Sequence, residues 1–245
     1  MNFEQLFNQK SEITENAHAR VNIIGEHTDY TGGFVMPTLL RFNTSVEISV
    51  SKEKKYQVYS KNYKNKKVFN DFKKSINNDW IDYVKGCLFV YFDENKKIKN
   101  TPVNIFISSN IPMERGISSS SALCVAILKS CNSLFQSKYS DKHIAILAQR
   151  VERDYIGVSG GIMDQMVSST EKMFEGWERH IDAGEHFDGH HFVRDLTLDI
   201  NLKCLLVNDF DPYVEAFHKI MDDIMDPPSF FDLAMPKWIP TLEYF

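Results

Sequence analysis

The sequence lacks several features that would assign it to a particular class of protein. No uninterrupted apolar stretch approaches the ~20 residues that a membrane-spanning helix needs. Residues 1–13 are mixed polar and include acids, a composition that excludes a secretory signal peptide. The four cysteines form no C-x-x-C pair, and Cys87, Cys124 and Cys131 lie among apolar residues, where buried free thiols are expected. These absences predict a reduced, cytoplasmic protein without a membrane partner.

An excess of positive charge is also missing. The chain has 28 Lys and Arg against 33 Asp and Glu, a net charge of −5 at pH 7, which gives no support for a nucleic-acid partner. Lysine-rich runs at 52–55, 61–67 and 96–99 are interpreted as solvated faces. The 245 residues suffice for one large domain or for one domain plus part of another, and nothing in the composition sets the oligomeric state.

The apolar periodicity predicts an α+β fold. Alternating apolar residues predict strands at 46–50, around Tyr56 and Val58, and at 103–107, with a Lys/Asn-rich connection after the second strand. Helical spacing predicts helices that begin at Trp80, and that span 118–135, 140–155 and 162–169. Beyond residue 170 the sequence is polar up to about 193, and then predicts a buried strand at 202–207 and a helix that begins at Asp211.

One run concentrates polar chemistry more than any other. Residues 20–33 read Arg-Val-Asn-Ile-Ile-Gly-Glu-His-Thr-Asp-Tyr-Thr-Gly-Gly, which places Arg20, Glu26, His27 and Asp29 beside glycines that let the backbone turn sharply. Their donor and acceptor patterns suit the hydroxyls of a small polyol such as a sugar. For any one of these residues, the alternative is a surface turn with ordinary charges.

This run resembles the signature of galactokinases, a family within the larger group of GHMP kinases, almost residue for residue. The resemblance implies ATP-dependent phosphorylation of the anomeric hydroxyl of galactose, with Mg²⁺. It also implies that Glu26, His27 and Asp29 hold the sugar.

A second motif, at 112–122, reads Pro-Met-Glu-Arg-Gly-Ile-Ser-Ser-Ser-Ser-Ala between a predicted strand and a predicted helix. Backbone N–H groups at a helix N-terminus, next to glycine and serine hydroxyls, form a phosphate cradle, although a serine run can also simply cap the helix. The motif is similar to the GHMP phosphate loop, Gly-x-Gly-Leu-Ser-Ser-Ser-Ala after a proline, with Glu114 in place of the first glycine and Ile117 in place of the leucine. The resemblance implies that four residues of the loop hold ATP: Gly116, Ser118, Ser119 and Ser120.

A third motif, Gly-Gly-Ile-Met-Asp-Gln, occupies residues 160–165. On its own, Asp164 could simply interact with a helix dipole. In galactokinases the aspartate of this motif faces the hydroxyl that is phosphorylated. By resemblance, Asp164 is the catalytic base, Arg20 keeps it ionised and stabilises developing phosphate charge, and Gly161 belongs to the sugar site.

Glu152 lies 12 residues upstream of Asp164. Mg²⁺ prefers carboxylate, hydroxyl, phosphate and water oxygens. By resemblance to other GHMP kinases, Glu152 and Ser120 supply the two protein ligands to the metal. The alternative for Glu152 is an acid on the helix surface beside Arg150 and Arg153. A polar loop with His180 and neighbouring histidines fits no ligand spacing, and Trp80, Tyr83 and Gly86 are interpreted as structural.

The resemblance covers about residues 12–169 and lacks the third, glycine-rich motif of galactokinases. We therefore expect a GHMP-kinase-type N-terminal domain over 1–200 and a short or truncated C-terminal segment over 201–245. Two other functions stay open from the sequence. One is a catalytically weak, galactokinase-like protein that binds sugar or nucleotide as a regulator, and the other is a GHMP kinase for another sugar.

Overall fold

The computed structural model describes residues 1–25, 28–31, 35–75, 79–98, 101–112, 116–158 and 160–170. The predicted domain boundary at residue 200, the strand at 202–207, the helix from Asp211 and the loop around His180 lie outside these residues. None of the helices in these ranges combines the length and the apolar composition that a membrane-spanning helix requires.

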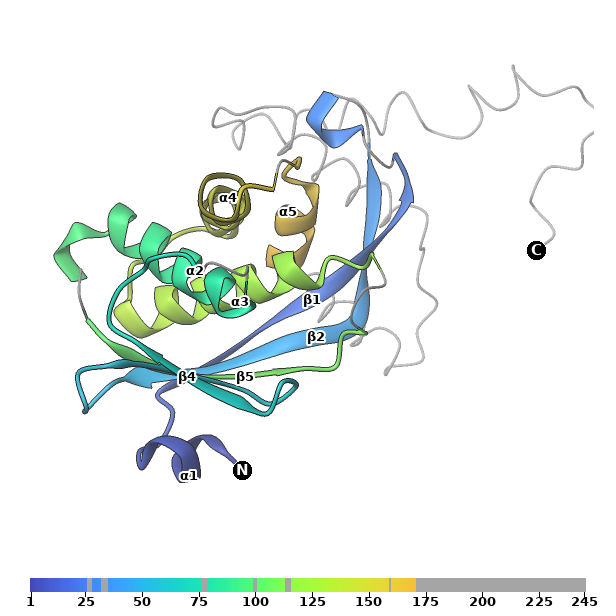
Figure 1. Ribbon diagram of the computed structural model, residues 1–245. Coiled ribbons are helices and arrows are strands. Elements are labelled where there is room, and N and C mark those ends of the chain that lie inside the picture. Colours follow the sequence, from blue (N-terminus) through green and yellow to red (C-terminus); the bar gives the residue numbers. More distant parts are fainter. Residues whose placement is uncertain are drawn as a thin grey trace, which may run out of the picture. The chain divides into compact units, whose positions relative to one another are not determined.

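A mixed five-stranded sheet forms the base of the fold (Figure 1), in the order β1-β2-β5-β3-β4. Its strands are β1 (Ile13–Ile24), β2 (Met36–Val50), β3 (Tyr56–Ser60), β4 (Asn65–Phe69) and β5 (Val103–Ser109). Only the β3–β5 pair is parallel among the neighbouring strands described. A parallel pair needs a crossover connection, and helix α2 (Ile81–Glu94) lies within it.

The three strands predicted from alternating residues are confirmed, and their apolar positions meet across the sheet. Val46 pairs with Ile107, while Ile48 and Val58 flank Ile105 from the two sides. All of these side chains are buried in one core. The period-two pattern was readable because one face of the sheet packs against helices.

The Lys/Asn-rich connection expected after the second strand is wrong, because residues 65–69 form β4. This strand pairs with β3 at the edge of the sheet, where Lys66 is exposed and Lys67 pairs with Asp79 at 2.8 Å. Phe69 stacks on Tyr56 with ring centroids 5.3 Å apart. Charged edge strands are common because they discourage pairing with other chains. β1 was not predicted either, since its buried residues Ala17 and Ala19 are too small to give a strong apolar signal.

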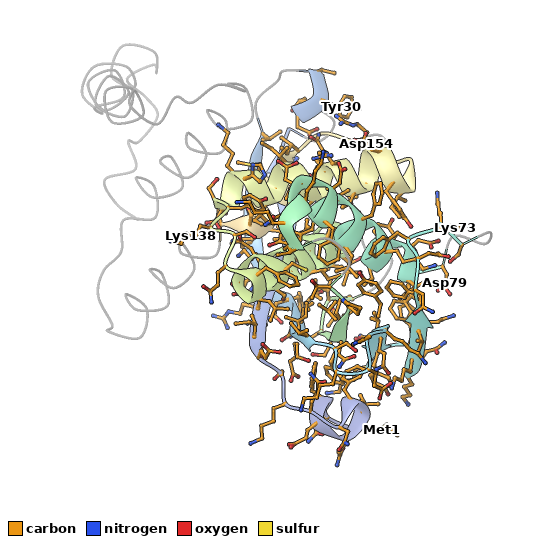
Figure 2. The ribbon with its side chains drawn as sticks, turned by 90° about the vertical axis from the view of Figure 1, so that its left-hand side faces the viewer. Met1, Tyr30, Lys73, Asp79, Lys138 and Asp154 are labelled. Carbon is orange, nitrogen blue, oxygen red and sulfur yellow. The ribbon has the colours of Figure 1, made fainter. Side chains whose placement is uncertain are left out.

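The predicted helices are confirmed and cover one face of the sheet (Figure 1). They are α2, α3 (Ser119–Phe135), α4 (Asp141–Arg150) and α5 (Met163–Ser169), and short 3₁₀ segments occur at Asp29–Thr31 (η1) and Lys96–Ile98 (η2). The unpredicted helix α1 (Phe3–Phe7) lies on the other face, where Phe3 and Phe7 pack on Phe106. In Figure 2, Met1 beside α1 and Tyr30 in η1 lie at opposite ends of the described part.

The helix predicted over 140–155 changes its winding near its end. After α4 the chain continues as a π-helix, η3 (Val151–Ile156), and Gly157 ends it with a φ of 89°. Single π turns within helices often occur at functional sites. Glu152 is the second residue of this turn. The thiols of Cys87, Cys124 and Cys131 are buried and free, as predicted.

Candidate active site

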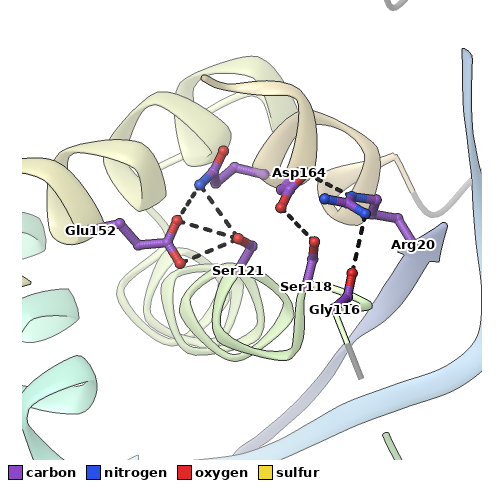
Figure 3. A network of polar contacts seen from close by, with 7 residues as sticks. Arg20, Gly116, Ser118, Ser121, Glu152 and Asp164 are labelled. Carbon is purple, nitrogen blue, oxygen red and sulfur yellow. Dashed lines mark hydrogen bonds and ion pairs between the residues drawn. The ribbon is translucent and has the colours of Figure 1, made fainter. Parts of the chain in front are cut away.

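Four segments that are distant in sequence meet at one cleft of about 260 Å³, which we call the carboxylate cleft. Figure 3 shows side chains from β1, the start of α3, η3 and α5 pointing toward one another. The cleft is lined by thirteen residues: Arg20, Asp29, Tyr30, Ser120, Ser121, Gln149, Glu152, Val158, Gly160, Gly161, Met163, Asp164 and Gln165.

Arg20 reaches the cleft from a strand whose register is irregular. Neighbouring side chains of a regular strand point to opposite faces, yet Ala19 and Arg20 are both buried. The pairing of β1 with β2 shifts between His18 and Arg20, and such bulges often re-aim a side chain at a functional site. The shift therefore explains how Arg20, only 7% exposed, turns toward α5.

Arg20 and Asp164 form the ion pair that the resemblance to galactokinases implies. Arg20 Nε lies 2.6 Å from Asp164 Oδ1, and Arg20 Nη1 donates to the carbonyl oxygen of Gly116 at 3.4 Å. The Asp164 side chain is 26% exposed, so the pair lies at the wall of the cleft with one member open to a ligand. A charge-assisted hydrogen bond of this kind is stronger than a neutral one.

Ser118 occupies the N-cap position of α3 and holds the other oxygen of the same carboxylate. Its hydroxyl donates to Asp164 Oδ2, and its backbone is left-handed with a φ of 57°. The sequence predicts Ser118 as a phosphate ligand, whereas here its hydroxyl binds the carboxylate. The N–H groups of the first turn, at Ser119, Ser120 and Ser121, have no intrahelical acceptor and are available to an anion.

Glu152 is held by a separate set of neutral donors. Ser121 Oγ lies 3.2 and 3.3 Å from the two carboxylate oxygens, and Gln165 Nε2 donates to Oε2. Burial raises the pKa of Glu152 above its ordinary value of 4.5, and the charge of Asp164 raises it further, while hydrogen bonds from Ser120, Gln165 and Ser121 act in the opposite direction.

The alternative of a surface acid beside two arginines is wrong for Glu152. Arg150 pairs with Asp93 and Glu94 on α2, and Arg153 pairs with its neighbour Asp154. Ser120 and Glu152 line the same cleft, so the structure brings the predicted metal pair together, and the Ser120 side chain acts to lower the pKa of Glu152.

Asp29 and Gly161 touch across the cleft although 132 residues separate them in sequence. A Cβ atom added at Gly161 would overlap with the Asp29 carboxylate, whereas one added at Gly160 would meet open space. Glycine is therefore required at 161 by a close approach. The other predicted sugar ligands, Glu26 and His27, lie outside the described residues, as does Glu114 of the phosphate loop.

Three further polar residues of this cleft were not predicted from the sequence. Ser121 and Gln165 bind Glu152, and Gln149 Nε2 donates to the carbonyl oxygen of Gly160 at 3.3 Å. Ser121 and Gln165 lie within the second and third motifs of the sequence. Their contact with Glu152 could not be predicted, because Glu152 belongs to a different helix, η3.

A second cleft of about 360 Å³, the aromatic cleft, opens on the other side of the serine run. Trp80 and Tyr83, interpreted as structural from the sequence, form part of its wall, and Tyr63 stacks on Trp80 with ring centroids 5.6 Å apart. Ser119 and Ser120 also line it. Ser120 therefore lines both clefts.

Two family models match this chain in the segments that carry these sites. Residues 1–50 match the galactokinase galactose-binding signature, and residues 82–172 match the N-terminal domain of GHMP kinases. Together these matches include Arg20, the serine run, Glu152 and Asp164.

Galactokinases are among the most similar relatives. The protein from Haemophilus influenzae (strain PittEE) is 35% identical over 187 residues, which are 74% of this chain and 47% of that protein. The protein from Pyrococcus furiosus is 39% identical over 155 residues, which are 63% of this chain and 43% of that protein. The matched part of the chain thus spans just under half the length of these relatives.

Solved structures give the same fold. The Lactococcus lactis galactokinase complexed with galactose superposes with a TM-score of 0.62 at 20% identity, covering 91% of this chain and 72% of that one. A mevalonate kinase superposes with a TM-score of 0.59 at 16% identity, covering 86% and 72%. The predicted GHMP-type α+β fold is confirmed. Residues 1–50 and 82–172 thus match segments of the GHMP kinase family, the fold is that of GHMP kinases, and the relatives in sequence are galactokinases.

Proposed function

We propose that the chain is an ATP-dependent sugar kinase that transfers the γ-phosphoryl group of ATP to the anomeric hydroxyl of galactose. The observation that carries the proposal is the position of Ser120, which lines both clefts. A nucleotide with its base in the aromatic cleft would pass the serine run with its phosphates and present the γ-phosphate to Asp164.

The aromatic cleft suits a purine base. Trp80 and Tyr83 offer flat apolar surfaces, and base–aromatic stacking contributes ~1–3 kcal/mol per base. From there the phosphates meet the first turn of α3, where unpaired N–H groups and the helix dipole favour negative charge. ATP binding and the buried, reduced thiols both fit the cytoplasmic location expected from the sequence.

The carboxylate cleft suits the acceptor sugar. Asp29, packed against Gly161, can accept hydrogen bonds from sugar hydroxyls. The match of residues 1–50 to a galactose-binding signature supports galactose as that sugar. Glu26 and His27 are proposed as further sugar ligands on the same ground.

Asp164 is proposed as the proton acceptor. The anomeric oxygen bonds to the γ-phosphorus, the bond from that phosphorus to the bridging oxygen of ADP breaks, and the hydroxyl proton passes to Asp164. Arg20 and Ser118 hold the two oxygens of this carboxylate, which fixes its orientation toward the cleft. The Arg20 guanidinium also places positive charge where phosphate charge develops.

The residues present fit a magnesium ion. The Ser120 hydroxyl and the Glu152 carboxylate are hard oxygen donors that line the same cleft, and the Glu152 carboxylate lacks the cationic partner that Arg20 gives Asp164 among the described residues. When bound, Mg²⁺ would neutralise charge on the phosphates of ATP.

The proposal is tested by ADP release from the full chain with galactose, ATP and Mg²⁺, beside a galactose-binding measurement. Asp164→Asn should lower turnover roughly 10²- to 10⁴-fold because it removes the proton acceptor, while an amide still hydrogen-bonds the sugar. Wild-type protein that binds galactose without releasing ADP would contradict the kinase and support the binding protein. Turnover unaffected by Asp164→Asn would contradict the mechanism.

A further inference from the structure

The carboxylate of Glu152 is gripped by side chains from two other elements, Ser121 of α3 and Gln165 of α5 (Figure 3). Gln165 Nε2 also lies 3.4 Å from Ser121 Oγ, so the three side chains form a closed ring of contacts. Ser121 is 2% exposed and Gln165 is 3% exposed. Bulk water therefore does not reach these donors to replace them.

We propose that Ser121 and Gln165 are positioning residues that orient the Glu152 carboxylate for a divalent cation held between Glu152 and Ser120. This inference rests on the proposed function, because the cation is the one that would accompany ATP. It assigns to two residues a task that the family signatures do not give them.

The sequence of the phosphate loop makes Ser121 distinctive. When Glu114 and Ile117 are aligned with the glycine and leucine that they replace, Ser121 falls on the final alanine of Gly-x-Gly-Leu-Ser-Ser-Ser-Ala. An alanine would offer no hydrogen bond there. The extra hydroxyl lies at nearly equal distances, 3.2 and 3.3 Å, from both oxygens of Glu152.

The chemistry of the donors fits a metal ligand better than a structural ion pair. A hydroxyl and an amide fix the plane of a carboxylate without cancelling its charge, so the negative charge stays available to a cation. The charge that acts on Glu152 from within the described residues is the like charge of Asp164. Groups that orient a metal ligand typically change metal affinity ~10- to 100-fold when they are removed.

The test uses electron paramagnetic resonance to measure the affinity of the full chain for Mn²⁺ in the presence of ADP. Ser121→Ala restores the alanine of the loop motif and should fold normally, and Gln165→Met removes the amide at similar volume. Each should weaken Mn²⁺ binding roughly 10- to 100-fold. ADP affinity measured without any cation should stay within about twofold, which a general loss of structure would not allow.

Ser133→Ala is the matched control. Ser133 lies on the same helix and its hydroxyl also binds a glutamate, Glu15, at 2.6 Å, but neither residue lines the carboxylate cleft. This variant should bind Mn²⁺ like the wild type. If Ser133→Ala weakens Mn²⁺ binding as much as Ser121→Ala does, the effect belongs to helix α3 in general and the inference is overturned.

The two remaining outcomes separate this inference from the proposed function. Wild-type affinity for Mn²⁺ in both Ser121→Ala and Gln165→Met would overturn the positioning role and leave the cation site intact. If Mn²⁺ binds no more tightly to ADP with wild-type protein than to ADP alone, the cation site itself is overturned, and the positioning role with it.

Discussion

Asp164 and Glu152 line one cleft, yet the protein holds them in opposite ways. Asp164 has a guanidinium at 2.6 Å from one oxygen and a serine hydroxyl on the other. Glu152 has only neutral donors, from serines and a glutamine, among the described residues. A carboxylate whose charge is balanced can take part in proton transfer without attracting a metal, whereas an unbalanced one favours a cation. The difference explains how two acids so close together can have separate tasks.

The largest expected effect comes from removing the Arg20 guanidinium, whose positive charge balances Asp164. Arg20→Met leaves Asp164 beside a buried apolar side chain. Breaking a buried ion pair costs ~3–5 kcal/mol, and because Asp164 is partly exposed we expect about 3 kcal/mol less unfolding free energy. Urea denaturation measures this change.

Arg150→Met serves as the control for that variant. Arg150 pairs with Asp93 and Glu94 at the surface, where an ion pair contributes roughly 0–1 kcal/mol. Equal destabilisation by the two substitutions would show that the balance of charge at Asp164 is not special.

A third carboxylate extends the comparison, because Asp29 is positioned by packing instead of by charge. Gly161→Ala would push the Asp29 carboxylate aside, and the loss of its hydrogen bonds, ~1–3 kcal/mol, should weaken galactose binding roughly 5- to 150-fold. Calorimetry with galactose measures the change, and Asp29→Ala should have an effect of the same size.

Gly160→Ala is the control, since its added methyl group meets open space. The double variant Asp29→Ala/Gly161→Ala should bind galactose no more weakly than Asp29→Ala alone, because both changes act on one contact. Full additivity in the double variant would show that Gly161 contacts the sugar independently of Asp29.

A smaller effect should appear in the pH dependence of stability. The pKa of Glu152 is raised in the folded state, mainly by burial. Its contribution to the free energy of unfolding is therefore most favourable below pH 4.5 and is lost as the pH rises through the raised pKa. Glu152→Gln removes this loss. Its unfolding free energy, relative to the wild type, should therefore be higher at pH 7 than at pH 4, by ~1.4 kcal/mol per unit of raised pKa.

The comparison is made by urea denaturation in a chelator. Adding Mg²⁺ and ADP should then stabilise the wild type more than Glu152→Gln, because the cation requires the ionised carboxylate. A difference that is the same at both pH values would place Glu152 in a more solvated setting than we describe.

The smallest effect concerns the strained cap beside Asp164. Ser118→Ala and Ser118→Gly both remove the hydroxyl that binds Asp164, but only glycine accepts the left-handed backbone at no steric cost. Ser118→Gly should therefore be more stable than Ser118→Ala by about 1 kcal/mol in urea denaturation. Equal stabilities would mean that the backbone relaxes out of this conformation.

The sequence predicted local elements well and contacts between elements poorly. The strand at 103–107 and the helix at 118–135 follow from periodicity, which local packing enforces. β4 escaped prediction because a lysine-rich edge strand is stabilised by its neighbour instead of by an apolar face. The pairing of Arg20 with Asp164 was predicted from the resemblance to galactokinases, and the spacing of the two residues in the sequence alone would not have predicted it.

Ser121 shows the same limit within the site. Its hydroxyl looked like one more cap in a serine run until the crossing of α3 with η3 placed it on Glu152. The amino-acid sequence alone does not predict where two helices cross, because the crossing depends on how the helices pack on the sheet.

The large sequence separation between Arg20 and Asp164 has a consequence for folding during synthesis. The two residues are 144 positions apart, so the ion pair closes one of the longest loops within the described residues. During synthesis, the segment that contains Arg20 leaves the ribosome well before Asp164 has been added, and chains with many such distant contacts fold slowly. The candidate active site should therefore be among the last parts to assemble, and any chain that stops before residue 164 would carry a buried arginine without its partner.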